Sequence, residues 1–273
     1  MHFFIHNSYH AGDVVLSRAL IMKVIQQFPG VKVTLECPEN RKYLWADLQL
    51  PISIFPGKEY KSTKPTPNCP PEAVFINILF GLYQDIIDDY SLTHLNQIHT
   101  FNRQIHENNL QHHYLLKWEM YPPAMDFFQD VTLQFEVNPR GILVENGAVF
   151  SKQSQTDLNE NLQLITRSFP DIRFYCASKP LFSAPNVIDC SGLNLIELSK
   201  LSNRCCALLT RGSGVNAASY TEINRFKPRC IFGLRTQEIN IWSDSRNPVV
   251  YADSVAEAIQ FLNSIADQFT NKI

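Results

Sequence analysis

The loop Thr210–Asn216 (TRGSGVN) has the residue types of a phosphate-binding turn. It follows an apolar run and opens a helical stretch, so its backbone N–H groups and the positive end of the helix favour an anion. Gly212 and Gly214 would let a phosphate approach the backbone, and Arg211 or Ser213 could add donors. We therefore predict a diphosphate site here. The alternative is a tight turn that needs glycine torsions, since the loop matches neither a Walker loop nor GxGxxG.

A second loop, Ser8–Asp13, lies between the first apolar run and the first helical stretch. Such a loop lies at the carboxyl edge of a sheet, where α/β proteins bind ligands. Asp13 could simply cap its helix. It could also act as a general base on a bound hydroxyl. His10 is a second candidate base, because its unperturbed pKa lies nearer to neutrality.

The third loop, Asn146–Lys152, occupies the equivalent position in the second half of the chain. Lys152 could neutralise a phosphate there, or it could be a solvated surface lysine. No Ser-His-Asp or Cys-His arrangement follows from the spacing of residues in any of the three loops.

The histidines and cysteines do not show the spacing of a metal site. Five histidines fall in a polar stretch without an HExxH pattern, and we expect them on solvated helix faces. They are His94, His99, His106, His112 and His113. The seven cysteines form no CxxC pair, and their odd number argues against a disulfide framework. We expect free thiols in a reducing compartment, and no metal.

A repeated pattern indicates which elements hold these loops. Gln27–Val33 (QFPGVKV) and Arg167–Phe174 (RSFPDIRF) each close a helical stretch that an apolar run and a loop precede. Strand, loop, helix, Phe-Pro turn and strand form the opening of a nucleotide-binding βαβ unit. We predict two similar α/β domains with a ligand site in the cleft between them. Coincidence is the alternative, because Phe-Pro commonly follows a helix.

The remaining pattern alternates strands with helices, which predicts parallel sheets. We expect strands at 31–37, 74–80, 142–144, 172–176, 187–189, 205–210 and 230–232, and helices at 13–28, 156–169, 195–202, 214–225 and 254–268. Six prolines between 51 and 71 predict a loop or an irregular sheet edge. Val137–Gly141 is the best linker candidate, so we expect domains at 1–138 and 139–273.

Composition narrows the class of protein further. A chain of 273 residues with 45% hydrophobic content can form two modest cores. The formal net charge of −2 gives no general attraction to nucleic acid or to an anionic membrane. The N-terminus lacks the basic region and long apolar core of a signal peptide, and no apolar run reaches the ~20 residues of a membrane span. We expect a cytoplasmic globular protein.

Several of these segments resemble one family. Ala11–Leu16 (AGDVVL) resembles the N-terminal signature of the heptosyltransferase-like glycosyltransferases of bacterial surface-polysaccharide synthesis. Asn186–Gly192 (NVIDCSG) and Cys230–Gly233 (CIFG) resemble later segments of that family in the same order. Lys152 falls where the family often carries a lysine near the donor phosphates. The family's Asp and His in its Asp-Ser-Gly-Pro-x-His loop are replaced here by Gly212 and Ala217.

The resemblance implies a GT-B architecture, in which two Rossmann-like domains with parallel sheets face a central cleft. It implies metal-independent, inverting transfer of a sugar from a nucleotide-diphosphate sugar to a glycan or glycolipid acceptor, with no further cofactor. Asp13 or His10 would be the base, and Lys152, Arg211 and residues 212–214 would stabilise the leaving diphosphate. The alternatives are a non-catalytic GT-B-like nucleotide- or glycan-binding or scaffold protein and an epimerase of related fold. A glycolipid acceptor would also imply peripheral membrane contact through the first domain.

Overall fold

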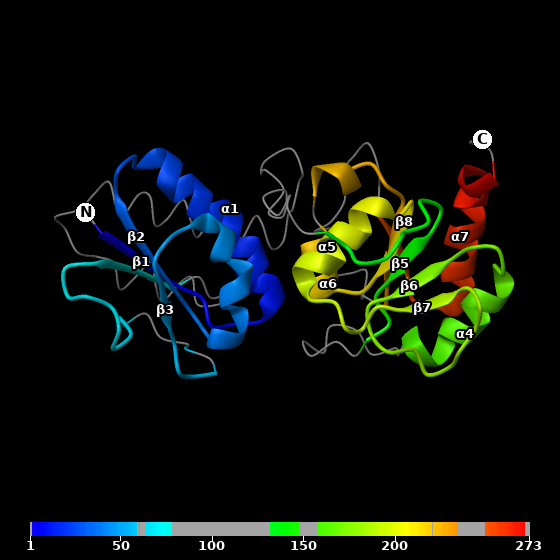
Figure 1. Ribbon diagram of the computed structural model, residues 1–273, viewed down its shortest axis with the longest axis horizontal. Coiled ribbons are helices and arrows are strands. Elements are labelled where there is room, and N and C mark those ends of the chain that lie inside the picture. Colours follow the sequence, from blue (N-terminus) through cyan, green and yellow to red (C-terminus); the bar gives the residue numbers. More distant parts are fainter. Residues whose placement is uncertain are drawn as a thin grey trace. The chain divides into compact units, whose positions relative to one another are not determined.

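The computed structural model describes residues 2–58, 60, 64–77, 132–147, 158–219, 221–233 and 249–270. The chain separates into two compact units, residues 1–116 and 117–273 (Figure 1). Each unit is built on a parallel sheet, so the α/β class and the two parallel sheets expected from the sequence are confirmed. The domain boundary at 138/139 stays a prediction.

The first unit contains a four-stranded sheet in the order β3-β2-β1-β4. Its strands are β1 (His2–His6), β2 (Lys32–Cys37), β3 (Ile52–Ile54) and β4 (Val74–Asn77), and every pair is parallel. All five residues of β1 are buried, as a strand covered on both faces of a sheet requires. The short strand β3 lies at the sheet edge, which fits the proline-rich stretch around it.

Helix α1 (Ala11–Gln27) follows β1 and is held by an ion pair that reaches across the unit. The Arg18 guanidinium donates two hydrogen bonds to the Asp47 carboxylate at 2.8 and 2.5 Å and one to the Leu44 carbonyl at 2.5 Å. Arg18 is fully buried, so this bidentate pairing supplies the hydrogen bonds that its charge needs. It fixes α1 against the 3-10 turns η1 (Glu39–Leu44) and η2 (Ala46–Leu48).

The second unit contains a six-stranded sheet in the order β10-β9-β8-β5-β6-β7. Its strands are β5 (Ile142–Val144), β6 (Phe174–Cys176), β7 (Val187–Asp189), β8 (Ala207–Thr210), β9 (Arg229–Phe232) and β10 (Val250–Ala252), all paired in parallel. Counted from β5, this is the 3-2-1-4-5-6 order of a dinucleotide-binding sheet. Strand β10 was not predicted from the sequence.

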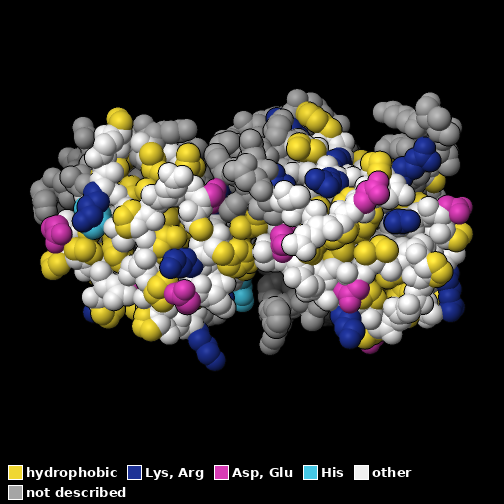
Figure 2. All heavy atoms as spheres, in the orientation of Figure 1, with side chains coloured by type: hydrophobic (Ala, Val, Ile, Leu, Met, Phe, Trp, Pro, Cys, Tyr) yellow, Lys and Arg dark blue, Asp and Glu magenta, His cyan; other side chains and the backbone are white. Residues whose placement is uncertain are grey.

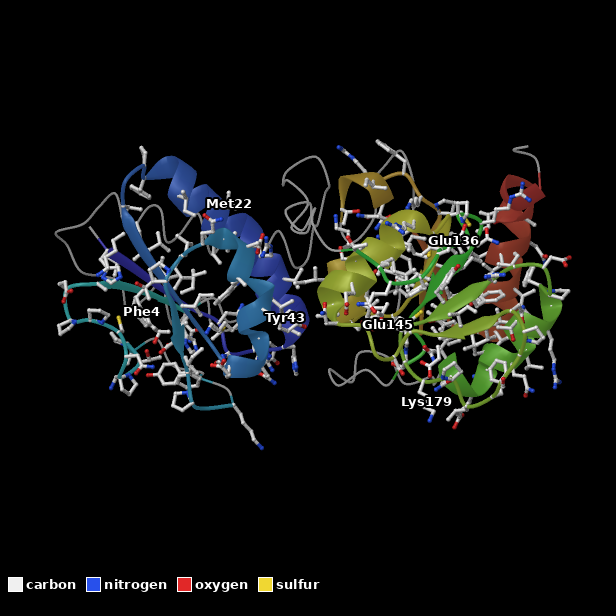
Figure 3. All side chains as sticks on the ribbon, viewed as in Figure 1. Phe4, Met22, Tyr43, Glu136, Glu145 and Lys179 are labelled. Atoms are coloured by element: carbon white, nitrogen blue, oxygen red, sulfur yellow. The ribbon has the colours of Figure 1, made fainter. Side chains whose placement is uncertain are left out.

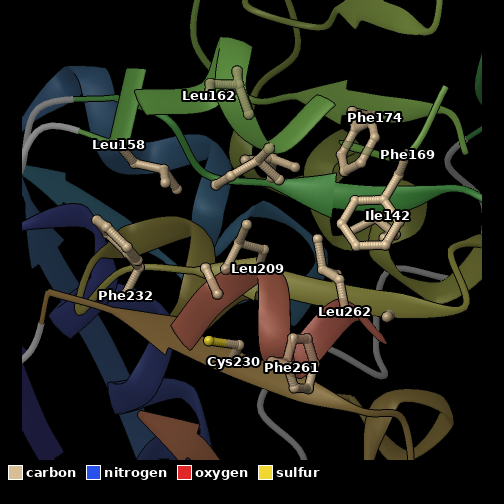
Figure 4. Close-up of a cluster of buried hydrophobic side chains, with 14 of the residues drawn as sticks. Ile142, Leu158, Leu162, Phe169, Phe174, Leu209, Cys230, Phe232, Phe261 and Leu262 are labelled. Carbon is tan, nitrogen blue, oxygen red and sulfur yellow. The ribbon is translucent and has the colours of Figure 1, made fainter. Parts of the chain in front are cut away.

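Helices cover both faces of this sheet. Strand residues such as Phe174 and Leu209 pack with α4 (Leu158–Ser168) and α7 (Val255–Thr270) in one buried cluster (Figure 4). On the other face, Leu143 and Leu208 pack with α5 (Leu195–Arg204). Two buried layers on one sheet explain why its strands read as continuous apolar runs.

The helix expected at 214–225 is shorter than the sequence predicts. Helix α6 spans only Gly214–Ala218, and the 3-10 turn η3 (Glu222–Asn224) follows it. The Ser219 carbonyl accepts hydrogen bonds from the side chains of Asn224 (2.9 Å) and Arg229 (3.1 Å). These side chains take the acceptor that a continuing helix would use for its own backbone, so the helix ends here.

Gly141 stands at a close contact just before β5. A Cβ added there would meet the edge of the Tyr175 ring and lie 3.1 Å from the Asn138 carbonyl oxygen. The Tyr175 hydroxyl is itself fixed, because it accepts a hydrogen bond from the Asn138 N–H at 2.7 Å. The ring therefore has little freedom to move away from a methyl group at position 141.

We expect Gly141→Ala to destabilise the protein by about 1–3 kcal/mol, the usual cost of overpacking a filled site. Denaturant unfolding measures this difference. Gly192→Ala is the matched control, because nothing lies within 4 Å of a Cβ at that position. An equal stability for the two variants would show that Tyr175 gives way at no cost.

All seven cysteines are free and are described by the structure. Burial raises the pKa of the Cys37 and Cys176 thiols to about 12. The part-exposed thiols of Cys69 and Cys206 also have a raised pKa, about 11, for the same reason. These thiols are therefore protonated near neutral pH.

In the described part of the chain, no helix is both long and apolar enough to cross a membrane. The same residues contain no group of three His, Cys, Asp or Glu side chains that could hold a metal ion. The five histidines between 94 and 113 lie outside the described residues. On the face seen in Figure 2, basic and acidic side chains are interspersed.

Candidate functional site

The candidate loops of the second unit lie where its strand order reverses. Strands β5 and β8 are neighbours, and the chain winds outward from them in opposite directions. In open parallel sheets, ligands bind beyond the carboxyl ends of the two strands at such a switch point. Here these ends lead into Glu145–Gly147 after β5 and Arg211–Gly214 after β8. The predicted phosphate loop is therefore at the expected edge of the sheet.

Glu145, which is labelled in Figure 3, follows β5 directly, and the Arg211–Gly214 loop is arranged around its carboxyl. Its carboxyl accepts a hydrogen bond from the Arg211 N–H at 3.1 Å and another from the Ser213 hydroxyl. The Arg211 guanidinium turns to the Gly147 carbonyl, to which it donates at 2.6 Å. The side chains of Glu145 and Arg211 are both buried.

Burial raises the pKa of Glu145 to about 8, because the interior disfavours the charged carboxylate. The N–H groups of Arg211 and Val215 and the Arg211 charge offset part of this effect. The Glu145 carboxyl is therefore largely protonated at neutral pH. A protonated carboxyl retains acceptor capacity and gains one O–H donor.

The structure thus places Arg211 and Ser213 together, as the sequence predicts, and adds Glu145 to them. Ser213 also caps α6, because its hydroxyl oxygen accepts the Val215 N–H at 3.2 Å. Gly212 and Gly214 flank it and are half-buried. Lys152 lies outside the described residues, so its role as a phosphate ligand stays a prediction.

A second layer of polar contacts holds α6 behind this loop. The Asn216 side-chain oxygen accepts hydrogen bonds from the Thr210 hydroxyl at 2.8 Å and the Arg229 guanidinium at 2.7 Å. All three residues are buried. Because they come from α6, β8 and β9, they fix the helix start against two strands of the sheet. The Asn216 side-chain nitrogen is buried without a hydrogen-bond partner among the described residues, so the side-chain oxygen alone makes these contacts.

In the first unit, the predicted base candidates lie at the carboxyl end of β1, next to the switch between β1 and β4. Helix α1 begins at Ala11, and its first backbone bond runs from the Val14 N–H to the His10 carbonyl at 3.1 Å. Asn7 organises the loop, because its side chain accepts the Tyr9 N–H at 3.1 Å and donates to the Asp13 carbonyl at 3.2 Å. The loop thus brings His10 and Asp13 to one helix end.

Asp13 has the electrostatics of a poised base. Burial raises the pKa of its carboxyl to about 7, and the Arg41 charge and nearby backbone groups oppose this rise. Arg41, from η1, donates a hydrogen bond to the Ser8 carbonyl at 2.8 Å, which holds its charge near this loop. The His10 ring packs edge-on against Tyr9, with ring centroids 4.3 Å apart. Arg41 could not be predicted as part of this site, because it lies far from the loop along the chain.

A buried chain of hydrogen bonds, Ser8–His6–Glu36, holds the start of the same loop against β1 and β2. His6 Nε2 lies 2.9 Å from the Ser8 hydroxyl, and His6 Nδ1 lies 2.6 Å from the Glu36 carboxylate. Thr66 and Asn68 also donate to Glu36, each at 2.8 Å. These contacts hold the pKa of Glu36 below its usual value, although burial acts in the opposite direction.

This chain has the order of a Ser-His-acid triad, which the spacing of the residues did not reveal. The Ser8 hydroxyl oxygen, however, accepts the Tyr60 N–H at 2.8 Å, and Ser8 is only 1% exposed. A nucleophile needs access to its substrate, and Ser8 is buried. The Ser8–His6–Glu36 hydrogen bonds therefore support the structure of the loop. They join the end of β1 to β2 and to the segment that carries Tyr60 and Thr66.

Comparison with known proteins identifies the fold. No protein-family model and no curated protein matches the chain. Among solved structures, E. coli ADP-heptose LPS heptosyltransferase II is 10% identical, with a TM-score of 0.52 over 98% of this chain and 99% of its own. E. coli heptosyltransferase WaaC with ADP-2-deoxy-2-fluoro heptose is 11% identical, with a TM-score of 0.52 over 98% of each chain.

The fold also occurs in a protein with a different described activity. A putative UDP-N-acetylglucosamine 2-epimerase from Listeria monocytogenes is 8% identical, with a TM-score of 0.53 over 99% of this chain and 88% of its own. The resemblance read from the sequence is therefore confirmed at the level of architecture. The chain has the two-sheet GT-B fold that the heptosyltransferases share.

Proposed function

We propose that this protein is a glycosyltransferase that moves a sugar from a nucleotide-diphosphate sugar to a glycan or glycolipid acceptor. The observation that carries the proposal is Asp13, a carboxyl with a pKa near 7 at the carboxyl end of β1 in a chain with the GT-B fold. A general base works best when its pKa lies near the working pH. The seven free thiols support action in the cytoplasm.

In the proposed mechanism, residues 1–138 bind the acceptor and residues 139–273 bind the nucleotide sugar. Asp13, or His10 in its place, removes the proton of the acceptor hydroxyl as its oxygen attacks the anomeric carbon. The bond from that carbon to the diphosphate breaks, and transfer proceeds with inversion and without a metal, as the resemblance implies. Lys152, Arg211 and residues 212–214 stabilise the leaving diphosphate, because preorganised donors act where negative charge develops.

One observation favours a second candidate, a non-catalytic nucleotide- or glycan-binding protein. The Arg211 N–H and the Ser213 hydroxyl already hold Glu145, so these donors are engaged before any phosphate arrives. Gly212 and Ala217 also replace the acidic and histidine side chains of the family loop. A binding protein would retain the nucleotide without turnover.

A thermal-unfolding screen tests the donor site. The purified protein is heated with ADP, UDP, GDP and CMP and with their common sugar conjugates. We expect one nucleoside diphosphate to stabilise the protein by about 2.7 kcal/mol at a hundredfold excess over its Kd, which raises Tm visibly. No shift with any nucleotide would contradict a nucleotide-sugar donor.

Product analysis with the stabilising conjugate then separates the candidate activities. Hydrolysis of the nucleotide sugar without an acceptor supports the transferase. Tight binding without turnover supports the non-catalytic protein. Release of a changed sugar without an acceptor would identify an epimerase, whose fold is also compatible.

A further inference from the structure

The Arg211–Gly214 loop already holds an acidic group of its own. Two of its donors, the Arg211 N–H and the Ser213 hydroxyl, converge on the two oxygens of the Glu145 carboxyl. The Val215 N–H acts on the same carboxyl. The loop therefore has the donor geometry of an anion site. The group that occupies these donors is the Glu145 carboxyl, which follows the neighbouring strand β5.

A diphosphate at this loop would meet the Glu145 carboxyl at short range. Two negative charges a few ångströms apart in a buried site repel strongly, because the local dielectric is low. Arg211 is the charged group that acts on Glu145 from the β8–α6 loop, and its guanidinium is held at the Gly147 carbonyl. A protonated Glu145 removes the repulsion and offers its O–H to a phosphate oxygen.

We propose that Glu145 is a specificity-determining residue that makes nucleoside diphosphate binding at the Arg211–Gly214 loop depend on a proton carried by its carboxyl. The inference rests on the proposed function, which assigns the diphosphate to this loop. A neutral Glu145 carboxyl allows the diphosphate to bind, whereas an ionised Glu145 carboxylate repels it.

The direction of the pH effect follows from the burial of Glu145. Because its pKa is raised to about 8, the carboxyl is neutral through most of the physiological range and ionises above it. The affinity for a nucleoside diphosphate should then fall by about tenfold for each pH unit above pH 8, as linkage to one proton requires. The diphosphate itself keeps a constant charge in this range.

Isothermal titration of the wild-type protein with ADP, UDP, GDP and CDP at pH 7.5, 8.5 and 9.5 tests the inference. At pH 8.5, two buffers with different ionisation enthalpies give the number of protons taken up on binding. We expect an uptake of about three quarters of a proton at pH 8.5, because a group with a pKa of about 8 is about one quarter protonated there before binding. We also expect the affinity to fall by at least about tenfold between pH 7.5 and 9.5. Binding without proton uptake and without a fall in affinity would overturn the inference.

Glu145→Gln removes the ionisable group and keeps a similar shape. Its affinity should not change with pH, and at pH 9.5 it should exceed that of the wild type by at least tenfold. Glu160→Gln is the matched control, because Glu160 is exposed in the first turn of α4, and it should behave like the wild type. Should Glu145→Gln fail to fold, the proton uptake of the wild type still decides.

The two proposals fail in different ways. Binding by the wild type and Glu145→Gln with equal affinity at all three pH values would overturn the role of Glu145 alone. No binding of any nucleoside diphosphate by either protein would overturn the proposed function, and this inference with it. Binding by Glu145→Gln alone at all three pH values would overturn the proton dependence, because the wild type is expected to bind at pH 7.5, where its carboxyl is mostly neutral.

Discussion

Asp13→Asn is expected to lower the rate of sugar transfer by roughly 10²–10⁴-fold, the usual contribution of a positioned general base. Asparagine keeps the size of the side chain and cannot accept the proton of the acceptor hydroxyl. Affinity for the nucleotide should be unchanged, since the predicted diphosphate site lies in the other unit. The rate is measured with the donor that the thermal screen identifies.

The pH dependence of the same reaction gives an independent check. A base must be ionised to act, so kcat should rise with pH and level off above about pH 7, where burial has placed the pKa of Asp13. The His10→Gln variant should retain this profile if Asp13 is the base. Wild-type transfer by Asp13→Asn together with a large loss in His10→Gln would assign the base to His10.

Glu36→Ala is expected to destabilise the protein by roughly 3–5 kcal/mol, because it removes one partner of a buried, hydrogen-bonded pair. His6 and Glu36 are both fully buried and lie 2.6 Å apart. The substitution also removes the acceptor of the Thr66 hydroxyl and one of the two acceptors of the Asn68 amide, which keeps the Ile54 carbonyl at 3.1 Å. Urea unfolding of the wild type and the variant measures the loss.

Two further variants show whether the network causes this loss. Glu36→Gln retains a side-chain oxygen acceptor and should cost less than alanine. Glu39→Ala changes an exposed carboxylate a few residues away and should stay within about 0.5 kcal/mol of the wild type. If Glu36→Ala were as stable as Glu39→Ala, the Ser8–His6–Glu36 chain would not support the fold.

The sequence could predict the parts of the fold that local pattern determines. Buried parallel strands need apolar side chains on both faces, so runs such as Ile142–Val144 are visible without a structure. The helix starts near Asp13 and Gly214 could also be predicted, because in each case a polar loop separates an apolar run from a helical stretch. The carboxyl-edge position of both loops then follows from the parallel topology.

The contacts inside the site could not be predicted, because they join residues that are distant in sequence. Glu145 and Ser213 meet only because β5 and β8 are neighbours in the sheet. His6 and Glu36 meet across β1 and β2 at matched register. The early end of α6 depends on Arg229 from β9, and the helix pattern of the segment itself does not reveal it.

The reactivity of the free cysteine thiols reports which of the two units has unfolded locally. Cys37 and Cys69 belong to the first unit, and the other five cysteines belong to the second. Their raised pKa values keep them slow toward alkylating reagents while the chain is folded, and local opening restores ordinary thiol reactivity. A pulse of alkylating reagent therefore adds mass to the cysteines of a unit that has opened. Mass analysis of the peptides then shows when each unit opens, without any engineered probe.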